Sequence, residues 1–223
     1  MSEFIVLDMP GTYALKPHFQ SILRPAVAQL AASGIRANHI TIFACALSIA
    51  FGTMLLTSPD PRLFQILPLV IFIRMALNAM DGMLAREFNQ ATPLGMYLNE
   101  LGDVVSDVFL ILPFAHLRGF SPFWIWNVVV MSVIAEMAGI LAVMAGASRR
   151  YDGPMGKSDR ALVAGAAGLW AGIAGGLPQL AASLLLKILV VLLAVTVVER
   201  VRHGLRELSR TSPVVPNRED KHA

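Results

Sequence analysis

Acidic and amide side chains recur at helical spacing in two neighbouring stretches of this chain. Residues three or four positions apart lie on one face of an α-helix, because each residue turns the helix by about 100°. One such face carries Arg74, Asn78 and Asp81, and a second carries Gly95, Asn99, Asp103 and Asp107. Two consecutive antiparallel helices would bring these faces together. Carboxylate and amide oxygens without a neighbouring cysteine or histidine favour a hard cation, Mg²⁺, Mn²⁺ or Ca²⁺, over zinc or copper.

A cation of this kind commonly joins protein carboxylates to the phosphates of a substrate. Gly82, Ala85 and Gly95 keep the helix surfaces small, so that a flat ligand can approach the backbone, and Arg86 would then meet a phosphate oxygen. The pattern therefore predicts a metal site for a phosphate-bearing substrate. The competing interpretation is that these groups only cross-link helices. A single polar residue would fit that role, whereas so many acids on one helix pair favour the metal site.

The rest of the chain is suited to lipid. Of its 223 residues, 56% are hydrophobic and only 15% are charged, and the mean hydropathy is +0.63. This composition is too apolar for a soluble domain of this size and predicts an all-α integral membrane protein. Ionisable side chains inside a membrane are costly, so they are treated first as functional.

Six segments are long and apolar enough to cross a bilayer as helices. They cover residues 38–57, 62–80, 96–117, 122–147, 160–180 and 181–201. Lysines and arginines gather at one set of helix ends, which places both termini and the acidic stretch on the cytoplasmic side. This asymmetry accounts for the net charge of +3 without a nucleic-acid partner.

Two flanking segments complete the predicted organisation. Residues 17–35 place apolar side chains at near-helical spacing, which predicts an amphipathic helix on the cytoplasmic membrane surface. The polar, proline-bearing stretch after Arg210 predicts a disordered tail. The chain is thus divided into a cytoplasmic amino-terminal segment (1–36), a six-helix membrane domain (37–203) and a cytoplasmic tail (204–223).

The acidic stretch resembles the signature of the CDP-alcohol phosphotransferases, membrane enzymes of phospholipid synthesis. That signature reads DxxDGxxARx8GxxxDxxxD, and the spacing matches throughout at Asn78, Asp81, Gly82, Ala85, Arg86, Gly95, Asn99 and Asp103. The upstream stretch GIRANHIT also resembles the family's entry to its first membrane helix, although Ala37 stands where a proline is usual. By this resemblance Asn38 and Thr41 would help to hold the nucleotide, together with Asp81, Gly82, Ala85, Arg86 and Gly95.

The resemblance implies a reaction of the EC 2.7.8 type. An alcohol hydroxyl would attack the β-phosphorus of a CDP-linked lipid, most simply CDP-diacylglycerol, and release CMP. Mg²⁺ or Mn²⁺ would bind at Asn78, Asp81, Asn99, Glu100 and Asp103, and Asp103 would also serve as general base, with Asp107 as a further catalytic acid. The resemblance further implies a homodimer, and the expected location is a bacterial inner membrane.

The first and third aspartates of the signature are Asn78 and Asn99 here. An amide oxygen can bind a hard cation, but each replacement removes one negative charge, so two divalent ions would be underneutralised. Glu100 and Asp107 are the residues that would compensate. Three hypotheses follow: an active enzyme with a rearranged metal site, an enzyme with fewer metals, and a noncatalytic protein that binds nucleotide or lipid. A cation transporter is a further alternative.

A basic loop between the fourth and fifth predicted helices faces the same side as the signature. Its polar residues Arg149, Arg150, Lys157, Ser158 and Arg160 would suit an acceptor alcohol, in particular a phosphorylated one. Ordinary anchoring at the membrane surface is the alternative for Arg149 and Arg150. Glu136 and Lys187 lie near mid-membrane in their predicted helices, where an interhelical ion pair between them is the least costly arrangement. A structural or oligomer-contact role is expected for both.

Overall fold

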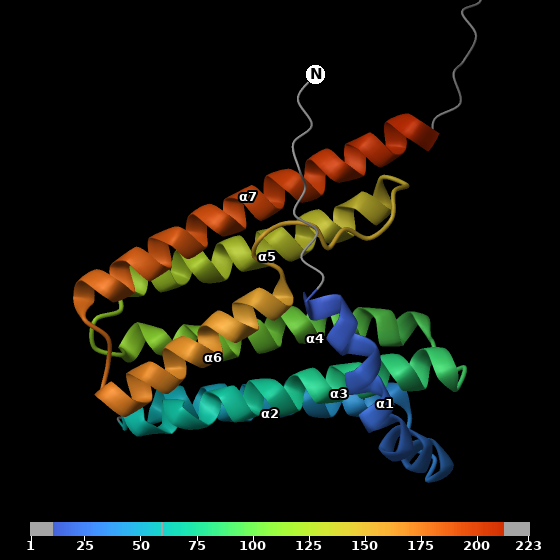
Figure 1. Cartoon of the computed structure of the whole chain (residues 1–223), viewed down its shortest axis with the longest axis horizontal. Coiled ribbons are helices and arrows are strands. Elements are labelled where there is room, and N and C mark those ends of the chain that lie inside the picture. Colours follow the sequence, from blue (N-terminus) through green and yellow to red (C-terminus); the bar gives the residue numbers. More distant parts are fainter. Residues whose placement is uncertain (1–10, 59, 212–223) are drawn as a thin grey trace, which may run out of the picture. The chain divides into compact units, whose positions relative to one another are not determined.

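The computed structural model of the chain describes residues 11–58 and 60–211 (Figure 1). Within these residues every secondary-structure element is a helix, and there is no strand. The elements are α1 (Gly11–Ala32), α2 (Ala37–Thr57), η1 (Pro61–Ile66), α3 (Leu67–Glu87), α4 (Pro93–Ile111), η2 (Leu112–His116), α5 (Pro122–Met144), α6 (Lys157–Ala174) and α7 (Gln179–Thr211), where η denotes a 3-10 helix. The predicted all-α fold is confirmed. The tail predicted after Arg210 falls almost entirely outside the described residues.

Four helical segments are long and apolar enough to cross a membrane, namely 37–57, 61–87, 122–144 and 179–210. The protein is therefore an integral membrane α-helical protein. α4 and α6 lie where two further membrane crossings were predicted, but by composition neither helix is apolar enough to count as a membrane span. α4 carries Glu100, Asp103 and Asp107, and α6 is an 18-residue helix that opens with Lys157, Asp159 and Arg160.

The helix bounds differ from the prediction at two places that matter for function. The second predicted segment was expected to end at Met80, whereas α3 continues to Glu87 and so places the first half of the signature on a regular helix. The fifth was expected to reach Leu180, whereas α6 ends at Ala174 because Gly175 follows with φ of 70° and Gly176 with φ of 136°. Glycine adopts such left-handed conformations without a steric penalty, and it commonly ends helices.

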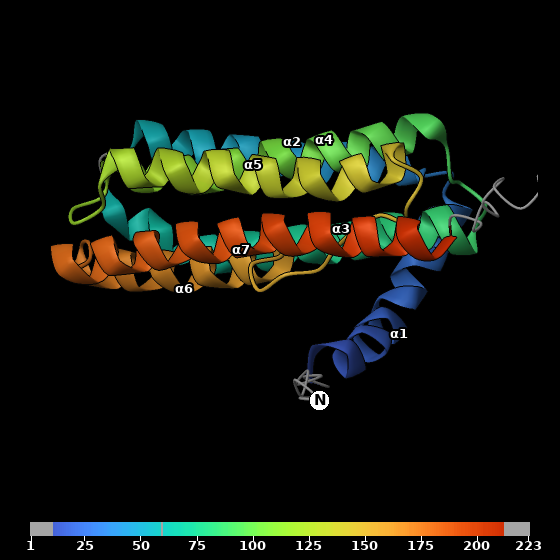
Figure 2. The same cartoon turned by 90° about the horizontal axis from the view of Figure 1, so that it is seen from above.

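The chain divides into two compact units, one formed by Met1–Phe51 and Leu69–Phe109 and the other by Gly52–Pro68 and Leu110–Ala223. In the first unit, Val27 of α1 is fully buried against Ile40 of α2 and Met83 and Leu84 of α3. Figure 2 shows α1 running obliquely to α3 of the same unit. The predicted apolar face of α1 is only partly used in this contact, since Ile22 on the same helix is 63% exposed.

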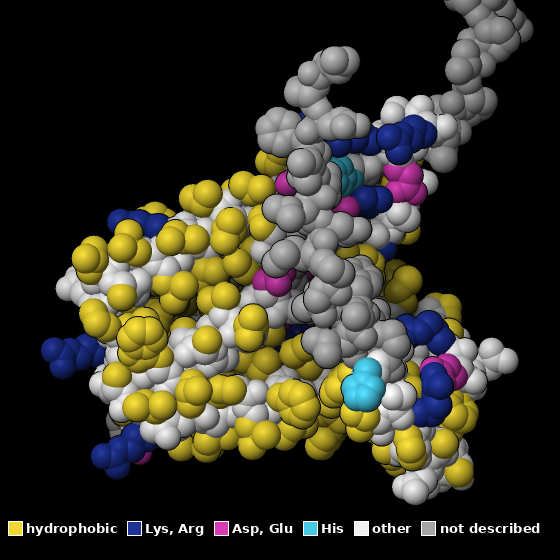
Figure 3. Space-filling model, in the orientation of Figure 1, with side chains coloured by type: hydrophobic (Ala, Val, Ile, Leu, Met, Phe, Trp, Pro, Cys, Tyr) yellow, Lys and Arg dark blue, Asp and Glu magenta, His cyan; other side chains and the backbone are white. Residues whose placement is uncertain are grey.

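In the second unit, α5 and α7 pack along each other and α6 packs against η1. A close approach of α6 to η1 is possible because Gly172 lies there: the Gln65 amide donates to the Gly172 carbonyl over 2.9 Å, and a Cβ on Gly172 would lie 2.7 Å from Gln65. Phe64, Phe114 and Phe120 stack edge to face with ring centroids 5.1 and 5.3 Å apart. Figure 3 shows hydrophobic side chains over the visible faces of α6 and α7, and charged ones gathered toward the carboxyl end of α7.

Candidate active site

The two polar faces predicted from the sequence meet between α3 and α4, and Arg74 joins them. This arginine is only 4% exposed. Its Nη1 lies 2.7 Å from Asp107 Oδ1, and its Nη2 lies 3.3 Å from Asp103 Oδ1 and donates to the Asp103 carbonyl over 3.1 Å. Asp103 and Asp107 lie one turn apart on α4, so one guanidinium reaches both carboxylates.

Asn78 lies one turn along α3 from Arg74 and makes the next contact. Its side-chain amide donates to Asp103 Oδ1 over 3.0 Å. Asp103 Oδ1 thus faces two nitrogen groups of α3, one charged and one neutral. An aspartate at position 78 has no N–H to donate, so the signature's own residue would not make this bond.

Asp81 takes its contact from the neighbouring helix α2. The buried Thr41 hydroxyl donates to Asp81 Oδ2 over 2.7 Å, and the Ala37 carbonyl, at 3.1 Å, is its alternative acceptor. Asp81 is itself only 6% exposed. Thr41 was predicted to hold the nucleotide, and the structure places it where it orients the Asp81 carboxylate.

The predicted small residues lie against polar side chains of the site. A Cβ on Gly95 would come within 2.7 Å of Asn38 Oδ1, and a Cβ on Gly82 would lie 3.1 Å from the Arg86 guanidinium nitrogens. Gly95 and Asn38 are therefore in direct proximity, and the exposed Arg86 side chain lies back over Gly82 on the same helix. Ala85 instead packs against the hydrophobic core around Val27 and Leu84.

Asn99 and Glu100 are half-buried on α4. No group of three or more aspartate, glutamate, histidine or cysteine side chains lies close enough to hold a metal ion among the described residues. The oxygen donors at the site are two signature carboxylates, Asp81 and Asp103, with the amides of Asn78 and Asn99. This oxygen-only donor set fits a hard divalent cation in chemistry, with fewer carboxylates than the signature would supply.

Comparison with known proteins decides the family. A sequence profile of the CDP-alcohol phosphatidyltransferase family matches residues 35–198. The chain belongs to this family. It is also 50% identical over 157 residues to the inner membrane protein YnbA of Escherichia coli K12, an alignment that covers 70% of this chain and 78% of that protein.

Two solved structures of phosphatidylinositol phosphate synthase (PgsA1) from Mycobacterium tuberculosis share the fold, each with a TM-score of 0.67. The complex with manganese and citrate is 20% identical and covers 87% of this chain and 91% of its own. The PgsA1 chain with CDP-DAG bound is 21% identical to this chain, and the match covers 89% of this chain and 98% of the PgsA1 chain.

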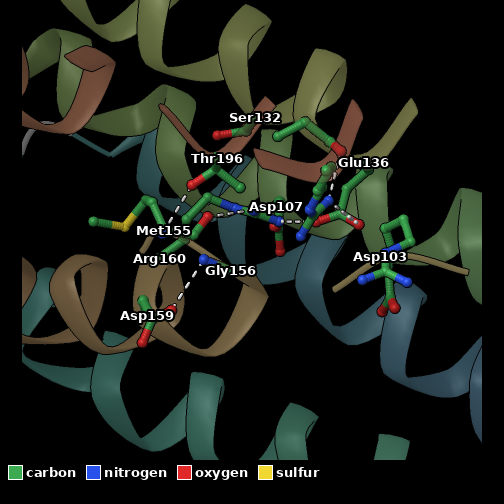
Figure 4. Close-up of polar contacts among 12 residues, drawn as sticks. Asp103, Asp107, Ser132, Glu136, Met155, Gly156, Asp159, Arg160 and Thr196 are labelled. Atoms are coloured by element: carbon green, nitrogen blue, oxygen red, sulfur yellow. Dashed lines mark hydrogen bonds and ion pairs between the residues drawn. The ribbon is translucent and has the colours of Figure 1, made fainter. Parts of the chain in front are cut away.

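A second charged cluster lies in the other compact unit, around Glu136 of α5 (Figure 4). Arg160 of α6 donates to Glu136 Oε1 over 2.8 Å, and Arg149 donates to Oε2 over 3.2 Å. Arg200 of α7, 1% exposed, lies 3.5 Å from Oε2 and donates to the Ala135 and Asp152 carbonyls. The predicted pair of Glu136 with Lys187 is wrong: the Lys187 ammonium lies over the Trp124 ring, 5.7 Å from its centroid.

The loop between α5 and α6 is held by its own ion pairs. Arg150 makes a two-pronged contact with Asp152, at 2.7 and 2.9 Å, and also reaches Glu207 over 2.8 Å. His203 Nδ1 lies 2.9 Å from Asp152 Oδ1. Burial raises the pKa of the Asp152 carboxyl, but the contacts with Arg150 and His203 lower it more, so this pKa lies below its usual value.

The predicted acceptor residues therefore fall into different surroundings. Arg149 and Arg160 share Glu136, whereas Arg150 belongs to the Asp152 contacts. Lys157 and Ser158 begin α6, where Asp159 accepts a hydrogen bond from the Gly156 amide over 2.9 Å and caps the helix (Figure 4).

Sequence reasoning missed Arg200 and left the role of Arg74 undecided. Arg200 is one of the arginines at the basic helix ends, so the charge pattern of the sequence indicates only an anchor on the cytoplasmic side. The signal in the sequence is Glu136 itself, because a glutamate within a predicted membrane helix requires a cation from another part of the chain. The sequence does not specify which cation, because the rotation of one helix against another is a tertiary property.

Proposed function

We propose that the protein transfers a phosphatidyl group from a CDP-linked lipid, CDP-diacylglycerol, to a polar alcohol and releases CMP. The observation that carries the proposal is the arrangement around Asp81 and Asp103. These two signature residues remain carboxylates in a chain of this family, and each is oriented by a donor from a neighbouring helix: Thr41 for Asp81, and Asn78 for Asp103. Such preorganisation is typical of a site that works on a substrate.

In the proposed reaction the acceptor oxygen forms a bond to the β-phosphorus, and the bond from that phosphorus to the oxygen of CMP breaks. Asp103 takes the proton of the acceptor hydroxyl. Asp107 acts through Arg74, whose guanidinium it holds in contact with Asp103. The nucleotide side of the site is formed by Asn38, Thr41, Gly82, Arg86 and Gly95, with Ala85 packed beneath them in the hydrophobic core. Because Gly95 has no side chain, Asn38 can lie directly against its backbone.

A divalent cation, Mg²⁺ or Mn²⁺, would neutralise the pyrophosphate and the leaving CMP when bound. Asp81 and Asp103 are its proposed carboxylate ligands, and Asn78, Asn99 and Glu100 complete the predicted set. The manganese in the PgsA1 complex supports this assignment. The CDP-DAG in the second PgsA1 complex supports the lipid substrate.

We propose that the polar acceptor binds at the basic residues of the α5–α6 region, Arg149, Arg150, Lys157, Ser158 and Arg160. Because Glu136 already contacts Arg149 and Arg160, an acceptor phosphate would compete with this internal carboxylate for the same donors. Arg149→Gln should therefore raise KM for the acceptor at least threefold without changing KM for the CDP-linked lipid. Arg62→Gln, at an exposed arginine near the opposite predicted membrane surface, is the matched control.

The proposed membrane arrangement has six crossings, with α4 and α6 entering the bilayer beside the four clearly apolar helices. α1 lies on the cytoplasmic surface, and its exposed Ile22 faces lipid. Both termini and the signature face the cytoplasm. The location is a bacterial inner membrane, as the name of the YnbA relative supports. The proposed assembly is a homodimer, as the family resemblance implies.

Two other functions remain as outcomes to test. A noncatalytic protein that binds CDP-lipid is favoured by the two asparagines of the signature. A cation transporter would bind its ion regardless of CDP, whereas the transferase should bind CDP and the metal cooperatively, each raising the affinity for the other.

The deciding experiment measures CMP release from CDP-diacylglycerol by the purified full chain in detergent, with Mg²⁺ or Mn²⁺ and a pool of polar alcohols. We expect CMP and a new lipid in equal amounts. Asp103→Asn should abolish both products, because the base is lost while an isosteric side chain keeps the contact region filled. Asp60→Asn makes the same chemical change outside the signature, where Asp60 caps η1, and should leave turnover unchanged.

No turnover together with metal-dependent CDP binding would replace the transferase with the binding protein. Unchanged CDP affinity after both Arg86→Gln and Gly82→Leu would remove the nucleotide assignment of the stretch. Metal binding that ignores CDP would favour transport.

A further inference from the structure

The contacts between α3 and α4 bear on how many metal ions the site takes. Arg74 and Asn78 lie four residues apart on α3, and Asp103 and Asp107 lie four residues apart on α4. The four side chains form a polar ladder, in which Arg74 contacts both acids and Asn78 contacts Asp103. With Arg74 only 4% exposed, this ladder is an internal element of the helix pair.

The ladder places N–H groups where a cation would have to lie in order to bridge positions 78 and 103. Asp103 Oδ1 has the Asn78 amide nitrogen at 3.0 Å and an Arg74 nitrogen at 3.3 Å. Two carboxylates at that distance would repel each other strongly in a low-dielectric setting and would require a cation between them. The amide of Asn78 removes that requirement, because it donates a hydrogen bond to the same oxygen.

The charge count of the site also argues against a second divalent cation. Asn78 and Asn99 together remove two negative charges from the signature, which is the charge of one divalent cation. Arg74 adds a positive charge, and Asp107, with which it pairs at 2.7 Å, offsets it. Glu100 follows Asn99 directly, so it is turned about 100° away from the face of α4 that carries Asn99, Asp103 and Asp107.

We propose that the site binds one divalent cation per chain, with Asp81 as its principal ligand, and that Arg74 and Asn78 provide the contacts to Asp103 that a second cation would otherwise supply. This inference rests on the proposed function, which gives the cation its role. A consequence is that the α3–α4 contact forms without metal.

The test counts Mn²⁺ ions bound to the purified full chain in detergent, by electron paramagnetic resonance of free Mn²⁺, with and without CDP. We expect one ion per wild-type chain in the presence of CDP. The double variant Asn78→Asp/Asn99→Asp, which restores the signature, should bind two. Asn89→Asp adds the same charge at an exposed residue of the α3–α4 connection and should keep the wild-type count.

A second measurement does not depend on the double variant folding well. Thermal unfolding is followed in EDTA and in Mn²⁺ for the wild type, Asn78→Asp and Asn89→Asp. Asn78→Asp should lose stability in EDTA and regain it in Mn²⁺, with a larger Mn²⁺-dependent shift than the wild type or Asn89→Asp. Equal shifts in all three proteins would overturn the role assigned to Asn78.

Two ions on the wild-type chain would overturn the proposal, and so would none. These outcomes are separate from failure of the proposed function. One bound ion without CMP release would disprove the proposed transferase activity and support the single-cation site. Two bound ions with CMP release would support the transferase activity and disprove the single-cation site.

Discussion

Gly95 gives a direct test of the nucleotide side of the site. A methyl group there would come within 2.7 Å of Asn38 Oδ1, so Gly95→Ala should displace Asn38 and weaken CDP binding about tenfold. Gly102 lies on the same helix, but a Cβ there meets Cys45 Cβ at an ordinary 3.6 Å. Gly102→Ala should leave CDP affinity unchanged. Isothermal titration with CDP and Mn²⁺ compares the two, and equal losses would disprove the role of Gly95.

Thr41 tests how Asp81 is oriented. Thr41→Val keeps the shape of the side chain and removes the hydroxyl that donates to Asp81 Oδ2, leaving a buried carboxylate without this donor. We expect a loss of about 1–3 kcal/mol in unfolding free energy and weaker Mn²⁺ binding. Thr57, on the same helix, donates only to carbonyls of its own preceding turn. Thr57→Val should cost much less, and denaturation in detergent measures both.

At the residue scale, the sequence indicated which side chains lie near each other but not which atoms of those side chains make the contact. Spacing alone predicted that the faces of Asn78 and Asp103 would touch. It did not reveal that Asn78 acts as a hydrogen-bond donor, because an amide can present either its oxygen or its nitrogen, and the choice depends on the neighbouring carboxylate. The role of Arg74 was equally undecided, since its reach to α4 depends on the relative heights of two helices.

The α5–α6 loop should weaken in acid, because Asp152 has a lowered pKa. A carboxyl with a lowered folded-state pKa contributes stability above its unfolded value, and that contribution is lost as the pH falls through the folded value. Asp152→Asn should therefore lower the Tm at pH 6, and the difference from wild type should begin to shrink below about pH 4 and close as the pH falls through the lowered pKa of Asp152. Circular dichroism melting across this range measures the gap. A gap independent of pH would show that Asp152 acts through packing alone.

At the scale of elements, apolar length located six of the helices well. The errors arose where tertiary contacts decide. The proposed partner of Glu136 was Lys187, a choice based on depth in the membrane, but Arg149, Arg160 and Arg200 are the residues that reach it. Depth is a property of each helix alone, whereas a pairing also depends on the face that each helix presents, and α5 and α7 pack with the Arg200 side of α7 toward Glu136.

For the whole molecule, six crossings predict an alternation that single cysteines can report. In a Cys45→Ser background, Ser58→Cys and Ser121→Cys should react with a membrane-impermeant thiol reagent on intact cells. Ser33→Cys and Ser148→Cys should react only after the membrane is opened. These serines precede or follow successive helices; Ser33 and Ser148 are exposed, and Ser58 and Ser121 are half-buried. With only four crossings, at least one of the four positions would lie on the opposite side.

The Glu136 cluster also constrains the order in which the chain is made. Ribosomes complete α5 before α6 and α7 exist, so Glu136 enters the membrane before Arg160 and Arg200 have been synthesised. A nascent chain stopped in the α5–α6 loop therefore carries a buried acid that lacks two of its eventual cations. Such a fragment should be degraded faster than the same fragment with Glu136→Gln, which pulse-chase labelling would show. Glu136 gains its last cationic partner, Arg200, only when α7 has been synthesised. The ion-pair cluster is therefore complete only once the last helix of the membrane domain has been made.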